Sequence, residues 1–416
     1  MTITDAPASD RRALITGLGV LAPNGLSTEQ YWESVLAGES GICELTRFDT
    51  SAYASRLAGQ VRGFVAEDHL PGRLLPQTDV STRFALAAAD AALADAASGP
   101  DTFEDYAMGV VTANALGGFE FTHREFRKLW DSGPEFVSVY ESFAWFYAVN
   151  TGQISIRNAM RGPGMALVSE QAGGLDALGQ ARRAVASGSD LMVSGGVDSA
   201  LDPWGWASQL AGGRVSTVQD PDRAYLPFDA EAAGYVPGEG GALLVMEAAS
   251  AARERGAPRI YGELAGHAST FDPAPGSERR RTGLVRAAEG AMAQAGVRAA
   301  DIDVVFADAA GVPTLDREEA IALNALFSRR GVPVTAPKAL TGRLYSGGGP
   351  LDVATALLSL RDDVVPPTPH TRQVPDEYGI DLVLDEPRHQ PLSTALVLAR
   401  GRWGFNSAVV VRSAEA

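Results

Sequence analysis

One stretch of the sequence has the form of a catalytic turn: Ala166–Ala181, with the letters ALVSEQAGGLDALGQA. Its first residues predict the end of a short buried strand, and Gly173 and Gly174 predict a tight turn. From Leu175 the apolar residues follow a helical period, so Gln171 or a neighbour lies where a strand turns into a helix. A cysteine at such a helix N-terminus would have a lowered pKa and act as a nucleophile. An amide at this position donates and accepts hydrogen bonds but cannot form an acyl-enzyme.

The sequence of this turn resembles a motif of a known family. Val168-Ser-x-x-x-x-Gly-x-Asp-Ala177 is similar to the nucleophile elbow of β-ketoacyl synthases, with Gln171 at the position of their cysteine. The form Ser-Glu-Gln-Ala-Gly-Gly resembles the chain length factor of type II aromatic polyketide synthases. That protein is the β subunit that pairs with an active ketosynthase.

The resemblance implies two further catalytic positions, which ketosynthases fill with histidines that stabilise oxyanions. The first should follow the apolar residues 304–307, and Asp308 stands there. The second should follow a lysine motif, which is present with Lys338 retained and Arg343 in place of the histidine. None of the five histidines falls at a matching position. An acidic residue would oppose the development of an anion, so we interpret Asp308 and Arg343 as a buried ion pair that fills a vacated cavity, in preference to a working site.

Further similarity extends over nearly the whole chain. Pro227–Asp229 and Gly234–Ala242 resemble the two parts of a sequence block that is typical of the family. The arginine that often lies between these two parts is missing here. Gly401–Ser407 resembles the glycine-rich loop near the ketosynthase active site. Without the family resemblance, the sequence of Gly401–Ser407 predicts only a tight turn before a final strand.

Composition excludes several classes of protein. The chain has 416 residues, is 45% hydrophobic and 21% charged, and carries a net charge of −16, which disfavours binding to nucleic acid or to an anionic membrane. No apolar run reaches the roughly 18 residues that span a bilayer. Cys43 is the only cysteine, so no intrachain disulfide forms and a reducing cytoplasm is expected. No cofactor or metal motif is complete, since the glycines after residue 16 do not form a dinucleotide loop.

The order of predicted elements indicates an α/β protein made of two similar halves. The segments at 259–266, 301–307 and 332–358 repeat the pattern of strands, glycine turns and helices in the first half. We expect a lead-in at 1–11, one half at 12–255 and the other at 256–416. The family resemblance implies the thiolase fold, a layered α-β-α-β-α sandwich, while one large doubly wound sheet is the alternative.

A predicted helix near residue 120 carries a stripe of apolar side chains. Phe119, Thr122 and Phe126 follow the spacing i, i+3, i+7 and therefore share a face. The resemblance implies that this face lines the tunnel of a growing polyketide. The aromatic segment 140–149 follows, for which we expect core packing for most rings, with a subunit interface as the functional alternative.

The function implied by these features is that of a non-condensing subunit. An active ketosynthase α subunit would be its partner in a heterodimer and supply the cysteine and both histidines, while this chain sets the length of the polyketide, at about eight ketide units. The substrate would be a poly-β-keto chain built from malonyl units on an acyl carrier protein. The alternative is a malonyl-carrier-protein decarboxylase that uses Gln171 to prime the chain. A self-sufficient enzyme based on Cys43 is rejected, because that residue lies far from the elbow in sequence.

Overall fold

Each half of the chain builds the same five-stranded sheet. The strand order is β5-β4-β6-β7-β1 in the first half and β10-β9-β14-β15-β8 in the second. In both halves the first three strands are parallel and the last two are antiparallel to their neighbours. The predicted duplication of one αβ unit is therefore confirmed. The strands are β1 (Ala13–Leu21), β4 (Met108–Ala113), β5 (Gly164–Leu167), β6 (Leu191–Asp198), β7 (Gly240–Ala248), β8 (Gly262–Phe271), β9 (Val304–Phe306), β10 (Pro333–Thr335), β14 (Thr394–Arg400) and β15 (Phe405–Arg412).

The two sheets meet through a short contact between β1 and β8, where Leu14 and Ile15 pair with Glu263 and Gly262. This joint makes a continuous eleven-stranded array, with β12 (Asp381–Leu382) added at one edge. Two small hairpin-like pairs lie outside it: β2 (Ile42–Glu44) with β3 (Leu57–Gly59), and β11 (Val364–Val365) with β13 (Arg388–His389).

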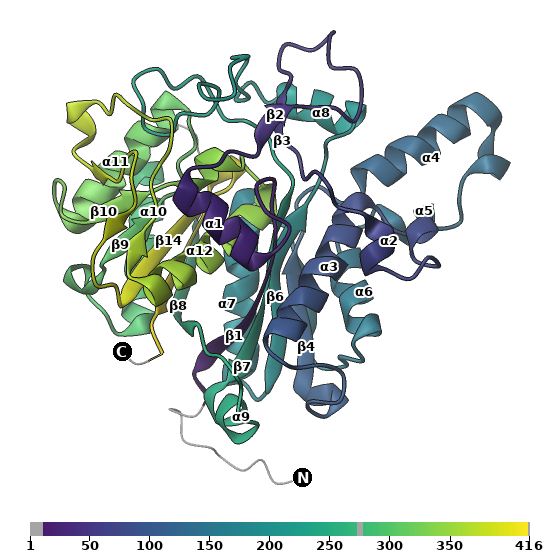
Figure 1. Ribbon diagram of the computed structural model, residues 1–416, viewed down its shortest axis with the longest axis horizontal. Helices are drawn as coiled ribbons and strands as arrows, with labels where there is room; N and C mark the ends of the chain where they lie inside the picture. Colours follow the sequence, from purple (N-terminus) through teal and green to yellow (C-terminus); the bar gives the residue numbers. More distant parts are fainter. Residues whose placement is uncertain (1–10, 273–277, 415–416) are drawn as a thin grey trace.

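Helices form three layers around these sheets (Figure 1). α7 (Gly173–Ala186) and α12 (Gly348–Asp362) pack on each other and touch strands of both halves, so they form the central layer. α3 (Val80–Asp95) and α6 (Val149–Arg157) cover the first sheet, and α10 (Glu278–Ala295) with α11 (Pro313–Phe327) covers the second. The arrangement is the expected α-β-α-β-α layering. The other helices are α1 (Thr28–Ala37), α2 (Ala66–His69), α4 (Phe119–Ser132), α5 (Glu141–Ala144), α8 (Pro203–Leu210) and α9 (Ala249–Glu254).

Local sequence signals explain where several of these helices begin. Ser27 caps α1 by accepting a hydrogen bond from the Gln30 amide, and Gly38 ends that helix in the left-handed conformation. Asp79 caps α3 and Asp202 caps α8, which has proline at its first position. The Asp79 carboxylate also accepts a hydrogen bond from the Phe121 amide of α4 at 3.0 Å, and α8 contacts α4 directly.

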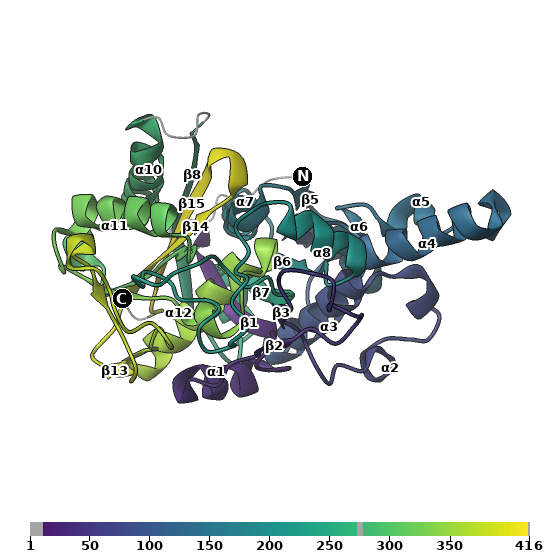
Figure 2. The same ribbon diagram turned by 90° about the horizontal axis from the view of Figure 1, so that it is seen from above.

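α4 and α5 extend away from the rest of the molecule in both views (Figures 1 and 2). α4 nevertheless keeps contacts with α8 at its base, and α5 packs against α4. Strand β5 lies at the free edge of the first sheet, and its first two residues, Gly164 and Met165, are exposed. The prediction of a buried strand before the elbow is therefore wrong, because in the described part of the chain only one side of β5 has a neighbouring strand.

The computed structural model describes residues 11–272 and 278–414, without the side chains of 278–282. Most of the predicted lead-in, residues 1–10, lies outside the described residues. Arg11, which we counted in that lead-in, donates to the Val185 and Ser189 carbonyls and pairs with Asp190 at 3.1 Å. Among the described helices, none is both long enough and apolar enough to cross a bilayer.

Candidate functional site

Gln171 lies at the sharp turn between β5 and α7, where the sequence places it. The chain reverses at Glu170, whose φ of +54° lies in the left-handed region, a conformation that costs a non-glycine residue about 1–2 kcal/mol. The glycines were predicted to form this turn, and that prediction is wrong. Gly173 and Gly174 begin α7, and a Cβ on Gly174 would come within 2.2 Å of the Pro350 ring. Close packing against the start of α12 therefore explains Gly174.

The Gln171 side chain is buried, with 7% of its surface exposed. Its Oε1 atom lies 3.6 Å from the position that a Cβ on Gly348 would take, at the first residue of α12. The N-termini of α7 and α12 thus both approach this amide. Helix N-termini favour negative charge and offer unpaired N–H groups. The site would suit a thiolate or an oxyanion, but Gln171 provides only a neutral hydrogen-bonding group.

Asp308 and Arg343 form a buried ion pair beside this turn. The Arg343 Nη2 atom lies 2.8 Å from Asp308 Oδ1, and Nη1 donates to the Asp308 carbonyl at 2.8 Å. Their side chains are 3% and 6% exposed. Residues from two separate loops, after β9 and after β10, are therefore joined where the family resemblance requires two histidines.

The pair belongs to a larger buried network. Arg400 donates to Asp308 Oδ2 at 3.2 Å through Nε and to Glu319 Oε2 at 3.1 Å through Nη2. Lys338 donates to the Ala307 carbonyl at 2.7 Å and pairs with Asp352 at 2.6 Å. Each buried charge has an opposite charge within 4 Å, which is the condition under which such groups are tolerated. The sequence indicated Lys338 but not Arg400, Glu319 or Asp352.

The network sets the protonation of its members. Burial opposes ionisation of Asp308, but the positive charges of Arg343, Arg400 and Lys338 outweigh it and hold the pKa of Asp308 well below its usual range. Burial raises the pKa of Asp352 to about 6, with Lys338 acting in the opposite direction. Asp308 is therefore an anion at neutral pH. A second negative charge developing beside it on a substrate would be repelled.

The cavity at Gln171 is too small for an acyl chain. It has a volume of about 50 Å³ and is lined by Glu170, Gln171, Asp308, Arg343 and Arg402 among others, which is room for only a few water molecules. The Arg402 amide donates to the Glu170 carboxylate, which closes the turn against the loop before β15. None of the five histidines lines this cavity. In the described part of the chain, no three His, Cys, Asp or Glu side chains are placed to hold a metal ion.

A separate groove of about 440 Å³ lies along α4, and Phe119, Thr122 and Phe126 all line it. The helical spacing therefore predicted their common face correctly. The opposite wall comes from Trp145 and Tyr147 near α5 and from Trp204 at the start of α8. Most of this lining is aromatic or aliphatic, as expected for a surface that accepts an uncharged chain.

Trp204 is a groove residue that the sequence did not indicate. Its ring centroid lies 5.0 Å from that of Phe119 and 5.8 Å from that of Phe126. The Asp202-Pro203 cap could have placed Trp204 in the first turn of a helix. No local pattern says that this helix packs on α4, which lies more than seventy residues earlier in the chain.

The aromatic residues after α4 do not form core. Trp145 and Phe146 are 45% and 48% exposed, and Tyr140, Phe143 and Tyr147 are half-buried. The expectation of core packing is therefore wrong for these rings, because α5 projects with α4 and has few layers to pack against. Further large apolar side chains are exposed on α4, in the segment between α4 and α5, on α6 and around β5: Trp130, Phe136, Val139, Ile156, Met165 and Val168. Exposed apolar surface beside a free strand edge indicates a protein–protein interface.

The fold and the site together define a class: two similar αβ halves, with a buried amide at the strand–helix turn of the first half and a buried ion pair beside it. The sequence matches the family models for "Beta-ketoacyl synthase, N-terminal domain" over residues 10–252 and "Beta-ketoacyl synthase, C-terminal domain" over residues 261–372. The chain belongs to the beta-ketoacyl synthase family.

Relatives within the family agree with the resemblance seen in the sequence. The chain is 68% identical to the actinorhodin polyketide putative beta-ketoacyl synthase 2 of Streptomyces coelicolor, over 96% of this chain and 98% of that one. It is 58% identical to the tetracenomycin polyketide synthase ketoacyl synthase beta subunit of Streptomyces glaucescens, over 96% and 98%. A solved beta-ketoacyl synthase from Burkholderia phymatum has a TM-score of 0.90 at 25% identity, over 97% of this chain and 99% of that one. The expected family and thiolase-type fold are confirmed.

Proposed function

We propose that this chain is the non-condensing subunit of a heterodimeric ketosynthase in aromatic polyketide biosynthesis, and that its α4 wall limits product length. The observation that carries the proposal is the ion pair of Asp308 and Arg343 beside Gln171. Condensation requires a nucleophile and oxyanion donors in one accessible site. Here an amide, an anion and a paired guanidinium occupy those positions around a cavity of about 50 Å³.

The condensing chemistry must then come from a partner chain, an active ketosynthase α subunit. The free edge of β5 and the exposed rings of Trp145 and Phe146 support a large interface on this side of the molecule. Aromatic side chains are enriched in the cores of such interfaces. A duplicated paralogue can take one half of a two-fold dimer when its contact surface is retained.

The groove along α4 opens on the same part of the molecule, between α4, α5 and α8. A chain grown at the partner's cysteine would enter it and stop where Phe119, Phe126 and Trp204 fill the space. The growing chain is carried by an acyl carrier protein. Carrier proteins are typically acidic and this chain has a net charge of −16, so we place the delivery of the substrate on the partner. The single cysteine supports a cytoplasmic location.

The rival function is decarboxylation of malonyl carrier protein at Gln171. An amide can stabilise an enolate oxygen by hydrogen bonding, so Gln171→Ala in the heterodimer distinguishes the two. Under our proposal the variant changes priming modestly and leaves elongation intact. A loss of all product that is restored by a preformed acyl primer favours the decarboxylase.

The test of the subunit role is co-expression with a ketosynthase that contains the cysteine and both histidines. We expect a heterodimer on size-exclusion chromatography, polyketide product by mass spectrometry, and poor solubility or self-association of this chain alone. A well-behaved monomer that adds nothing to the partner's product would refute the proposal.

A further inference from the structure

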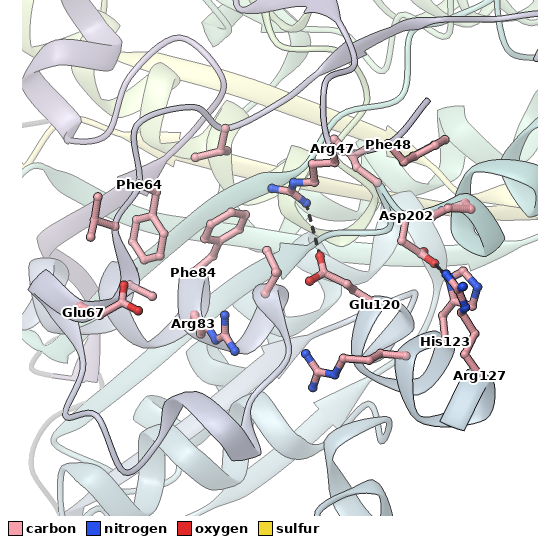
Figure 3. Close-up of a pocket in the computed structure, with 17 residues that line it drawn as sticks. Arg47, Phe48, Phe64, Glu67, Arg83, Phe84, Glu120, His123, Arg127 and Asp202 are labelled. Atoms are coloured by element: carbon pink, nitrogen blue, oxygen red, sulfur yellow. Dashed lines mark hydrogen bonds and ion pairs between the residues drawn. The ribbon is translucent and has the colours of Figure 1, made fainter. Parts of the chain in front are cut away.

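A side-chain contact beside the groove along α4 joins the two walls of that groove. The Nδ1 atom of His123, on α4, lies 2.6 Å from the Oδ2 atom of Asp202, the residue that caps α8 (Figure 3). Because a carboxylate only accepts hydrogen bonds, the imidazole is the donor. The contact therefore connects the wall that carries Phe119 with the wall that carries Trp204.

The α8 side of this contact is firmly held. Trp206, on α8, is fully buried, and its Nε1 atom donates to the Ser55 carbonyl at 3.2 Å. The Asp202 side chain is 5% exposed and also accepts from the Gly205 amide at 2.9 Å. One buried carboxylate thus caps α8 and binds His123 at the same time.

The α4 side is held less firmly. This helix projects from the molecule (Figures 1 and 2), and three of its 14 residues are buried. Its first turn is anchored through a backbone amide to Asp79. Beyond the segment that leads to α5, its side chains form two polar contacts within the described structure: His123 with Asp202, and Glu120 with Arg47. The Glu120 pair is 3.9 Å long and 41% exposed at the glutamate, so solvent screens it. The His123 hydrogen bond is shorter and ends on a buried carboxylate, so it is the stronger of the two.

The position of His123 on the helix relates this contact to the groove. His123 follows Phe119 by four residues, which is about one turn of α4, and therefore lies next to the groove face. The ring of Trp204 touches Phe119 and Phe126, but it is 43% exposed and is not fixed by burial. Ring contacts are not directional and tolerate a range of spacings, whereas a hydrogen bond restricts both distance and angle.

We propose that His123 is a positioning residue for product length: its hydrogen bond to Asp202 fixes the spacing between α4 and α8, and with it the space open to the growing chain. The inference rests on the subunit role proposed above, because it concerns the same groove. His123 lines neither the groove nor the cavity at Gln171, so it acts through the placement of the two helices.

The test compares variants of the heterodimer by mass spectrometry of the products made from malonyl carrier protein. His123→Leu removes the hydrogen bond, and His123→Asn keeps a side-chain donor near the position of Nδ1. Asp202→Ser keeps a good helix cap but is too short to reach His123. We expect His123→Leu and Asp202→Ser each to raise the ratio of longer to usual-length product about tenfold, the value of one hydrogen bond to a charged group. His123→Asn should restore most of the usual distribution.

His389→Leu is the matched control, because His389 is exposed on β13 in the second half of the chain and should leave product length unchanged. The effects of His123→Leu and Asp202→Ser should not add in the double variant, because both remove the same contact. The inference is overturned if either single variant leaves product length unchanged, or if His123→Asn fails to restore it. Less total product of unchanged length, or a heterodimer that no longer assembles, would give His123 a purely structural role and would overturn it as well.

The same assay separates this inference from the proposed function. Replacing Phe119 and Phe126 with alanine tests whether the groove limits product length at all. If that variant lengthens the product while His123→Leu and Asp202→Ser do not, only the positioning role of His123 fails. If none of these variants changes the length, the groove assignment fails, and the positioning role fails with it.

Discussion

Replacing Phe119 and Phe126 with alanine should lengthen the polyketide made by the heterodimer. Both rings are half-buried at the groove along α4, and Trp204 packs against each. Because neither ring is fully buried, their removal should cost only about 1–2 kcal/mol of stability in total. The complex should therefore still assemble, and any change in product can be assigned to the groove.

The helix geometry sets the size of the effect. Phe119 and Thr122 are one turn apart, or about 4.5 Å along the axis of α4. A ketide unit adds two carbons and extends a chain by about 2.5 Å, by analogy with the reach of the polypeptide backbone. One opened turn thus admits about two units. Neighbouring side chains relax partly into the space, so we expect one extra unit for either single variant and two for the pair.

The assay is mass spectrometry of products from the reconstituted heterodimer with malonyl carrier protein. Leu129→Ala is the control, since Leu129 lies on the same helix but does not line the groove. Trp204→Ala should also lengthen the product, because Trp204 forms the facing wall. If product length is unchanged in the double variant while the heterodimer forms normally, the rings are only packing groups and the tunnel assignment is wrong.

Three further predictions concern the replaced active site and its buried charges. Gln171→Cys should not produce a condensing subunit, because Asp308 and Arg343 stand where oxyanion donors are needed. Carbon–carbon bond formation by this variant chain alone with acyl carrier protein would refute this prediction. Arg343→Met should lower the free energy of unfolding by about 3 kcal/mol, because it removes one partner of a buried pair. Arg298→Met at an exposed pair should lower it far less, because solvent screens that pair. Similar losses for the two variants in denaturant titrations would contradict the first value. Burial raises the pKa of Asp316 to about 7, above its unfolded value of about 3.9. Between these two pKa values the folded chain binds more protons than the unfolded chain, so its stability should fall as pH rises from about 4 to about 7. A melting temperature that increases from pH 5 to 7.5 at constant ionic strength would argue against this prediction.

Short-range patterns in the sequence, together with the family resemblance, predicted the candidate site. The strand–turn–helix at Ala166–Ala181 placed Gln171 at an elbow, and the resemblance of the segments after β9 and β10 to family motifs singled out Asp308 and Arg343. Helical spacing alone put Phe119 and Phe126 on one face of α4. These features depend on a few neighbouring residues, so they can be predicted from the sequence without knowledge of the fold.

Packing decided what no local pattern contains. Arg400 and Glu319 complete the charge network, and Trp204 completes the groove, only because distant segments are brought together by the two sheets. The same reason explains the errors: Gly174 is required by the approach of α12, not by a turn, and the strand before Gln171 is exposed because it lies at a sheet edge. The burial of a side chain is determined by all the elements that pack around it, whereas the sequence shows only whether that side chain would tolerate burial.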